Sequence, residues 1–186
     1  RRGRAGQRED HAGAGAAARA AGGVGGVDDV DRARAQEQAQ WRQRTVYFVN
    51  AVLAGMAAAT ALPPVHFLPG LLGFAVLVAG LWRDAAGPLI AMRRGTLFGT
   101  GYFLVGLYWV GIAFFADAER FGPYAVPAVL ALAFGLGLTV GAACALTALR
   151  RWRRVEAQAL ALAAAWTLAE PLRGALGLQF PWNPVA

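Results

Sequence analysis

The residue types that most often carry out enzyme chemistry are few in this sequence and lie far apart. The single cysteine, Cys144, lies in an apolar stretch without an ionisable neighbour, whereas a nucleophilic thiolate needs a nearby base and a charge stabiliser. All 18 basic residues are arginines, so a lysine-assisted mechanism is excluded within this chain. The two histidines, His11 and His66, are distant in sequence, and the glycines match no phosphate-binding pattern. We therefore predict no catalytic residue, no metal site and no cofactor in this chain.

The most informative polar residues are Glu170 and Arg173, which lie at the end of an apolar segment. A separation of three residues places both side chains on one face of a helix, where they can form an ion pair. Two aromatic residues, Phe180 and Trp182, follow shortly afterwards. The pair either stabilises a helix end or faces a functional cavity, and the spacing alone favours neither reading.

Apolar segments must position these residues. The central segment, residues 95–116, has no charge over about 22 residues, and a helix of that length can cross a hydrocarbon core of roughly 30 Å. The chain is 57% hydrophobic and yet carries a net charge of +7. The two values are compatible because apolar segments alternate with arginine clusters along the sequence. The sequence predicts an all-α, polytopic transmembrane bundle of about five helices over residues 45–186, with spans at 45–62, 67–82, 95–116, 127–149 and 155–172.

The ends and packing of these spans can also be read from the sequence. Pro63 and Pro64 end the first helix, and His66 beside them is interpreted as a polar residue at the membrane interface. The first span could also be a signal peptide, but the long basic region before it favours an uncleaved helix. Two pairs of glycines four residues apart predict that helix backbones approach closely: Gly95 with Gly99, and Gly137 with Gly141.

Two aromatic residues and the cysteine within the spans are interpreted by how they pack. We expect Tyr108 and Trp109 to pack between helices, although a substrate surface is the alternative. Cys144 is interpreted as a small packing residue.

Residues 1–44 differ in composition from the rest of the chain. Arg, Gly, Ala, Asp and Gln dominate, and bulky apolar residues are nearly absent before Trp41. Such a segment cannot bury enough surface to offset its ordering entropy. We therefore predict a disordered polar tail.

The distribution of arginines predicts the orientation in the membrane. Counted from Arg42 onward, nine arginines flank the spans on the side of the N-terminus, and two, Arg120 and Arg173, lie on the opposite side. The N-terminus is therefore expected in the cytoplasm and the C-terminal end of this chain in the periplasm. Because the arginines flank apolar spans and do not interleave with aromatic residues on a polar surface, we expect the lipid bilayer and not nucleic acid as the partner.

Three stretches of the sequence resemble the bacterial apolipoprotein N-acyltransferases. The first is the run GTLFGTGYFLVGLYWVGIAF from Gly95, which is similar to the third transmembrane region of that family. The second is LPPVHFLPG from Leu62, and the third is AEPLRG from Ala169 together with FPWN from Phe180. Pro171 and Gln179 replace a tryptophan and a glycine of the family pattern. The resemblance covers roughly residues 51–186.

The resemblance implies an enzyme of the bacterial inner membrane. Such an enzyme passes an acyl chain from a phospholipid, through a cysteine of a periplasmic nitrilase-like domain, to the N-terminal diacylglyceryl-cysteine of an apolipoprotein. It further implies that Glu170, Arg173, Phe180 and Trp182 contribute to substrate binding. The catalytic Glu-Lys-Cys domain would lie beyond residue 186, so this chain alone is expected to be inactive. The alternatives are a small polytopic transporter or channel and a non-catalytic membrane scaffold.

Overall fold

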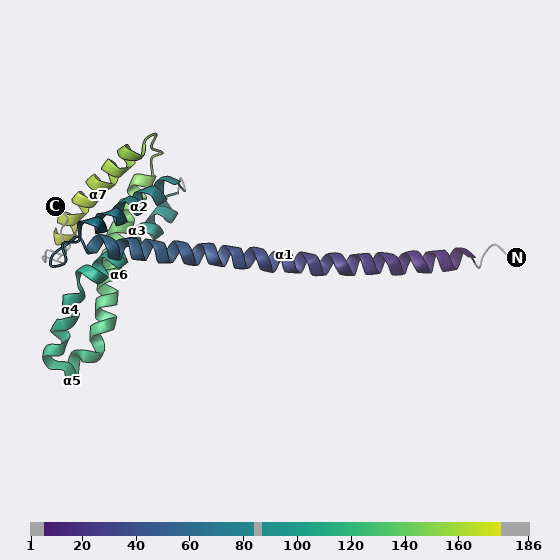
Figure 1. Ribbon diagram of the computed structural model, residues 1–186, viewed down its shortest axis with the longest axis horizontal. Coiled ribbons are helices and arrows are strands. Elements are labelled where there is room, and N and C mark those ends of the chain that lie inside the picture. Colours follow the sequence, from purple (N-terminus) through teal and green to yellow (C-terminus); the bar gives the residue numbers. More distant parts are fainter. Residues whose placement is uncertain (1–5, 84–86, 176–186) are drawn as a thin grey trace. The chain divides into compact units, whose positions relative to one another are not determined.

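The structure is a computed structural model that describes residues 6–83 and 87–175, with side chains described over residues 30–43, 45–83 and 87–171. Every regular element in these ranges is helical, which confirms the all-α prediction. Five helices have 12 residues or more: α1 (Gly6–Ala59), α2 (Leu72–Arg83), α3 (Pro88–Gly106), α6 (Ala125–Ala148) and α7 (Val155–Ala175). The short elements are η1 (Leu68–Leu71), α4 (Tyr108–Ala113), η2 (Phe114–Asp117), α5 (Ala118–Phe121) and η3 (Gly122–Tyr124) (Figure 1).

The chain divides into two compact units, residues 1–46 and residues 47–186. The predicted boundary between residues 44 and 45 lies near this division and stays a prediction. In the first unit α1 is helical from Gly6, and the disordered polar tail over residues 1–44 stays a prediction. Alanine, arginine and glutamine favour helix, and no proline interrupts the segment. All side chains described from residue 30 to residue 43 are exposed, so this part of α1 buries little of its own surface.

The first helix ends where the prolines predict. α1 stops at Ala59, and a turn carries the chain past Pro63 and Pro64 to His66, which has a positive φ of 52°. The His66 side chain is exposed, and its Nδ1 lies 3.1 Å from the carbonyl oxygen of Pro64. This contact is local and brings no further titratable group to the ring.

The central segment is arranged differently from the predicted span at 95–116. α3 begins earlier, at Pro88, because proline is favoured in the first turn of a helix, and it therefore includes Arg93 and Arg94. It also ends earlier, at Gly106, where glycine weakens the helix. Leu107 separates α3 from α4 with a φ of −112°.

The segment after Leu107 forms a hairpin, in which α4 and the start of α6 are joined through α5 (Figure 1). Tyr108 and Trp109 lie at its start and are 55% and 42% exposed in this chain, and Tyr108 lines a pocket with residues of α6, so the prediction that they pack between helices stays a prediction. Their side chains are exposed because this hairpin extends beyond the residues that bury α3. By length and composition, one helical stretch of the described residues is apolar enough to cross a membrane; it falls within Tyr108–Ala148, where the long continuous helix is α6, and Leu68–Arg83 is a shorter apolar helix.

Helices α3 and α6 pack closely through the predicted glycines. A Cβ atom added to Gly99 would lie 2.8 Å from the Cα of Gly137, and one added to Gly95 would lie 2.9 Å from the Cα of Gly141. Only residues without a side chain allow two backbones to approach this closely. The spacing of four residues on each helix is therefore confirmed as a packing motif.

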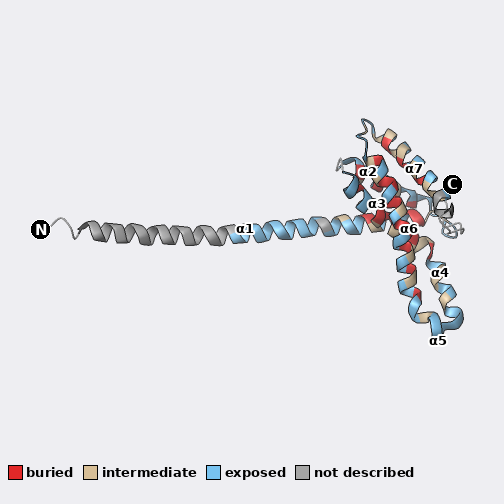
Figure 2. Ribbon diagram, turned by 180° about the vertical axis from the view of Figure 1, so that it is seen from behind, coloured by how far each residue is buried: buried red, intermediate tan, exposed pale blue. Residues whose placement is uncertain are grey.

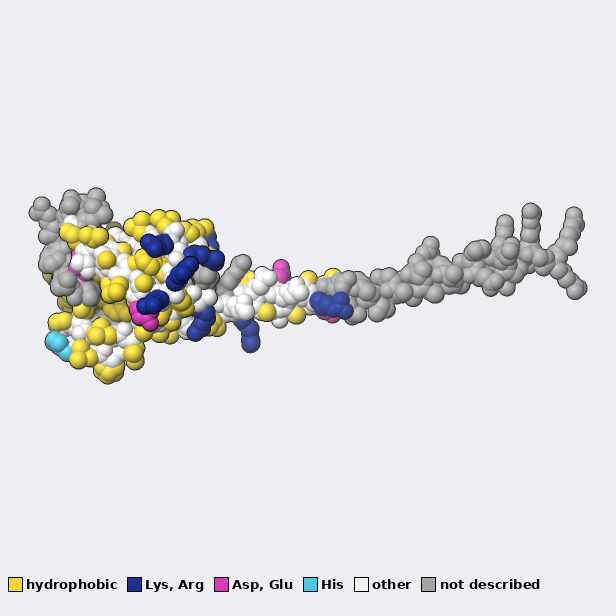
Figure 3. Space-filling model, turned by 90° about the horizontal axis from the view of Figure 1, so that it is seen from above, with side chains coloured by type: hydrophobic (Ala, Val, Ile, Leu, Met, Phe, Trp, Pro, Cys, Tyr) yellow, Lys and Arg dark blue, Asp and Glu magenta, His cyan; other side chains and the backbone are white. Residues whose placement is uncertain are grey.

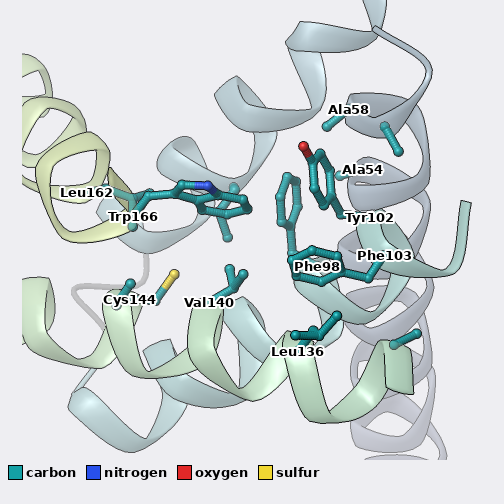
Figure 4. Close-up of a cluster of buried hydrophobic side chains, with 14 of the residues drawn as sticks. Ala54, Ala58, Phe98, Tyr102, Phe103, Leu136, Val140, Cys144, Leu162 and Trp166 are labelled. Atoms are coloured by element: carbon teal, nitrogen blue, oxygen red, sulfur yellow. The ribbon is translucent and has the colours of Figure 1, made fainter. Parts of the chain in front are cut away.

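The core of the second unit lies where the last turns of α1 meet α2, α3, α6 and α7, as the buried residues of Figure 2 show. Phe98, Tyr102 and Phe103 of α3 are at most 1% exposed. Cys144 of α6 is fully buried beside Gly95, which confirms its interpretation as a packing residue. α7 contributes Leu162 and Trp166 from the other side of this core (Figure 4).

Candidate functional site

An apolar groove of about 630 Å³ lies between α2 and α7. This volume is within the range of roughly 300–1,000 Å³ that is usual for small-molecule sites. Thr167 contributes a hydroxyl and Trp166 an indole N–H, and the other described lining side chains are hydrocarbon. The lining consists of Leu71, Phe74, Ala75, Val78, Ala79, Val155, Ala159, Leu162, Ala163, Trp166 and Thr167. Such a surface suits a hydrocarbon ligand and offers little to a polar one.

The groove follows two helices that run in opposite directions. Phe74 of α2 contacts Trp166 of α7, with ring centroids 5.4 Å apart. Trp82 of α2 and Gln158 of α7 lie together at the other end, where they line one smaller pocket. Each of these pairs is separated from the other by eight residues along its helix, which corresponds to about 12 Å. The lining of the groove itself runs from Val155 to Thr167 of α7, twelve residues apart, so the groove extends for about 18 Å along the helix axis.

Trp166 is held in place by an aromatic cluster. Its ring lies 5.6 Å from that of Tyr102 and 6.4 Å from that of Phe98, both in edge-to-face geometry. Phe74 joins the same cluster through contacts with Phe98 and Tyr102. Edge-to-face pairs contribute about 0.5–1.5 kcal/mol each beyond area burial, so several of them fix the wall of the groove (Figure 4).

Glu170 is connected to this wall. The indole Nε1–H of Trp166 donates a hydrogen bond to Oε1 of Glu170 at 3.2 Å, across one turn of α7. Glu170 is half-buried, and Pro171 after it lies inside α7, which continues to Ala175. The predicted side chain therefore lies at the end of the groove, next to its largest aromatic residue.

The remaining predicted site residues cannot be placed in the same way. The side chain of Arg173 lies outside the described part of the structure, so the predicted ion pair with Glu170 stays a prediction. Phe180 and Trp182 lie outside the described residues altogether.

Sequence reasoning missed Phe74 and Trp166 as site residues. The spacing of four residues between Trp166 and Glu170 is a signal that could have identified one of them, because it places both side chains on one face of a helix. No local signal identifies Phe74, since its contact with Trp166 joins residues that are far apart in the chain.

The fold and the groove together define an all-α domain with glycine-packed helices, an aromatic core and an elongated hydrocarbon-lined site. The sequence model of one family, described as the apolipoprotein N-acyltransferase N-terminal domain, matches residues 54–186. The chain belongs to this family.

Individual relatives support the same assignment. The chain is 45% identical over 139 residues to an apolipoprotein N-acyltransferase of Caulobacter vibrioides, which covers 72% of this chain and 25% of the relative. It is 36% identical over 163 residues to the apolipoprotein N-acyltransferase of Allorhizobium ampelinum, and the match covers 82% of this chain and 30% of the relative. It is 40% identical over 147 residues to the apolipoprotein N-acyltransferase of Rhodopseudomonas palustris, and the match covers 73% of this chain and 26% of the relative. The chain thus spans between a quarter and a third of the length of these relatives.

Proposed function

We propose that this chain is the first part of the membrane domain of an apolipoprotein N-acyltransferase. The family match over residues 54–186 carries this proposal. The whole enzyme would transfer an acyl chain from a phospholipid to the N-terminal diacylglyceryl-cysteine of an apolipoprotein. Because the chain spans only part of its relatives' length, the chemical step is assigned to the whole protein. The role proposed for this part is to anchor the enzyme and to receive the lipid.

The exposed surface supports a location within a bilayer as a polytopic bundle. Leu160 and Leu168 of α7 are each 72% exposed, although the same helix buries Leu162 and Trp166 in the core. Leu146 of α6 is 63% exposed, near the fully buried Cys144. Helices that are apolar on both their buried and their exposed faces suit surroundings of lipid better than water.

The positions of the arginines support the proposed orientation. Arg83 and Arg94 line one pocket, and Arg150 and Arg151 line another that also includes Trp82. The ends of α2 and α6, the first two turns of α3 and the first turn of α7 therefore share one basic end, and Figure 3 shows arginine side chains gathered over one part of this unit. By the positive-inside rule this end is assigned to the cytoplasm, and Glu170, at the far end of α7, to the periplasmic side.

The groove between α2 and α7 is the proposed entry site for the acyl chain of the phospholipid donor. Its hydrocarbon lining matches an acyl chain, and its length follows the helix axes, as a lipid tail in a bilayer would. Glu170, Arg173, Phe180 and Trp182 are proposed to bind the polar part of the substrate at the periplasmic end. The Trp166–Glu170 hydrogen bond supports this arrangement, because it joins the polar group to the groove wall.

Filling the groove tests this proposal in a full-length enzyme that carries these residues. Ala163 and its neighbour Ala164 are both exposed, but of the two only Ala163 lines the groove. Ala163→Phe should lower kcat/KM for the phospholipid donor about tenfold, because the ring occupies space needed by the acyl chain. Ala164→Phe is the matched control and should leave kcat/KM within about twofold.

Acyl transfer should be measured by mass spectrometry of an acceptor lipoprotein, with the 186-residue chain alone as the blank. Equal activity of the two variants would contradict the groove as the lipid entry site. It would favour the view that other helices of the whole enzyme cover this surface. Acylation by the 186-residue chain alone would contradict the assignment of chemistry to the rest of the protein.

A further inference from the structure

A second pocket, of about 340 Å³, lies at the basic end of the bundle and shares no lining residue with the groove. It is formed by the end of α2, the loop between α6 and α7 and the first turn of α7. Its lining carries two guanidinium groups, from Arg150 and Arg151, and two indole rings, from Trp82 and Trp152. The described lining contains no carboxylate, so this pocket favours an anionic ligand.

The polar groups of this pocket are held in defined positions. The indole Nε1–H of Trp152 donates a hydrogen bond to the carbonyl oxygen of Thr147 at 2.8 Å, which ties the loop to the end of α6. The Arg150 guanidinium carbon lies 5.2 Å from the centroid of the Trp152 ring. Stacking through the flat face leaves the N–H groups at the edge of the guanidinium directed at an acceptor. Gln158 adds an amide side chain to the lining and is only 6% exposed.

We infer that this pocket binds the phosphate headgroup of an anionic phospholipid. Arginine binds phosphate through paired N–H groups, and tryptophan is typical of the depth at which lipid headgroups lie. Basic pockets between helices at the cytoplasmic face are suited to such headgroups. Leu149, which is 71% exposed and lies between the lining residues Ala148 and Arg150 in the chain, provides an apolar side chain for the acyl chains. A free phosphate would gain nothing from that side chain.

This site is distinct from the proposed acyl-donor groove in place and in ligand chemistry. It binds a lipid at the opposite end of α7 from Glu170, and that lipid is not consumed. The inference rests on the membrane location proposed above, since only there does a lipid headgroup lie at this depth.

The test compares two pairs of arginines in the full 186-residue chain, purified in detergent. Arg150 and Arg151 line the pocket, whereas Arg153 and Arg154 are exposed, lie outside the lining and carry the same charge. Binding of phosphatidylglycerol and of phosphatidylethanolamine should be titrated by native mass spectrometry. We expect R150Q/R151Q to weaken phosphatidylglycerol binding at least about tenfold, and R153Q/R154Q to weaken it less than about twofold. Helical content should be checked by circular dichroism in each case.

Three outcomes would overturn the inference. Equal weakening by both pairs would assign the affinity to diffuse surface charge, and equal binding of the two lipids would show that the site has no preference for an anionic headgroup. Displacement of the lipid by glycerol phosphate would show that it is a site for a soluble phosphate. Extraction of the chain from membranes by alkaline carbonate is measured separately. If carbonate extracts the chain, both the membrane location and the inference are contradicted. If the chain stays in the membrane but does not prefer phosphatidylglycerol, only the inference is contradicted.

Discussion

Glu170 joins the aromatic core to the end of the groove through a hydrogen bond. Its Oε1 accepts from the indole of Trp166, whose ring contacts Phe74, Phe98 and Tyr102. The position of the carboxylate is therefore set by a buried ring that three other side chains hold. A half-buried carboxylate with such support is suited to orienting the polar part of a lipid substrate.

For single residues of the proposed site, we predict the effect of two substitutions in a full-length enzyme that carries Glu170 and Trp182. Glu170→Gln and Trp182→Ala should each lower acyl transfer at least tenfold, which corresponds to about 1.4 kcal/mol in the activation free energy. The reason is that each removes a group proposed to bind substrate. Acyl transfer to a lipoprotein is followed by mass spectrometry, and the amount of enzyme in the membrane by immunoblot. If both variants accumulate normally and work at the wild-type rate, these residues do not belong to the site.

Among the elements, the pairing of α3 with α6 determines where the core lies. Four glycines allow the two backbones to come together, and Thr96 and Thr100 of α3 border the contact. A Cβ atom added to Gly137 would lie 2.7 Å from the hydroxyl oxygen of Thr100 and 2.9 Å from the carbonyl oxygen of Thr96. The second of these is backbone, which cannot move aside without separating the helices.

Two glycines of α6 give a matched test of this contact. Gly137→Ala should lower the free energy of unfolding by about 1–3 kcal/mol, because the added methyl group overpacks the interface. For a Cβ added to Gly135, no heavy atom of the described residues lies within 4 Å, so Gly135→Ala should be neutral or stabilising by up to about 1 kcal/mol. Unfolding by SDS in detergent micelles, followed by circular dichroism, measures both. Similar values for the two variants would show that α3 and α6 do not pack in this way.

For the whole molecule, the alternation of apolar helices and arginine clusters determines the expected topology. Reporter fusions after Arg94 and Arg151 should be cytoplasmic, and fusions after Glu119 and Trp182 should be periplasmic. The physical reason is the cost of moving clustered arginines across the membrane. Alkaline phosphatase and fluorescent-protein fusions report the two sides independently. A periplasmic signal after Arg151 would contradict the orientation, and with it the assignment of the lipid-headgroup pocket to the cytoplasmic face.

The sequence by itself determined the helical class, the end of the first helix at the prolines, the helix over residues 155–172 and the glycine pairs. Each of these depends on local chemistry: hydrophobic content over a helix length, the missing amide of proline, and the absence of a Cβ. The family could also be recognised from short runs of residues, and the comparisons confirm it.

Only the tertiary structure decided the rest. It joined Phe74 to Trp166 and so formed the groove, it placed Glu170 at the groove's end, and it brought Arg150 and Arg151 next to Trp82. It also showed that the uncharged stretch from Gly95 to Ala116 is interrupted at Leu107, with Tyr108 and Trp109 exposed beyond it. Hydrophobic content predicts that a segment avoids water, but it does not specify which neighbour covers each face. That choice depends on contacts between residues far apart in the chain, which a local pattern does not contain.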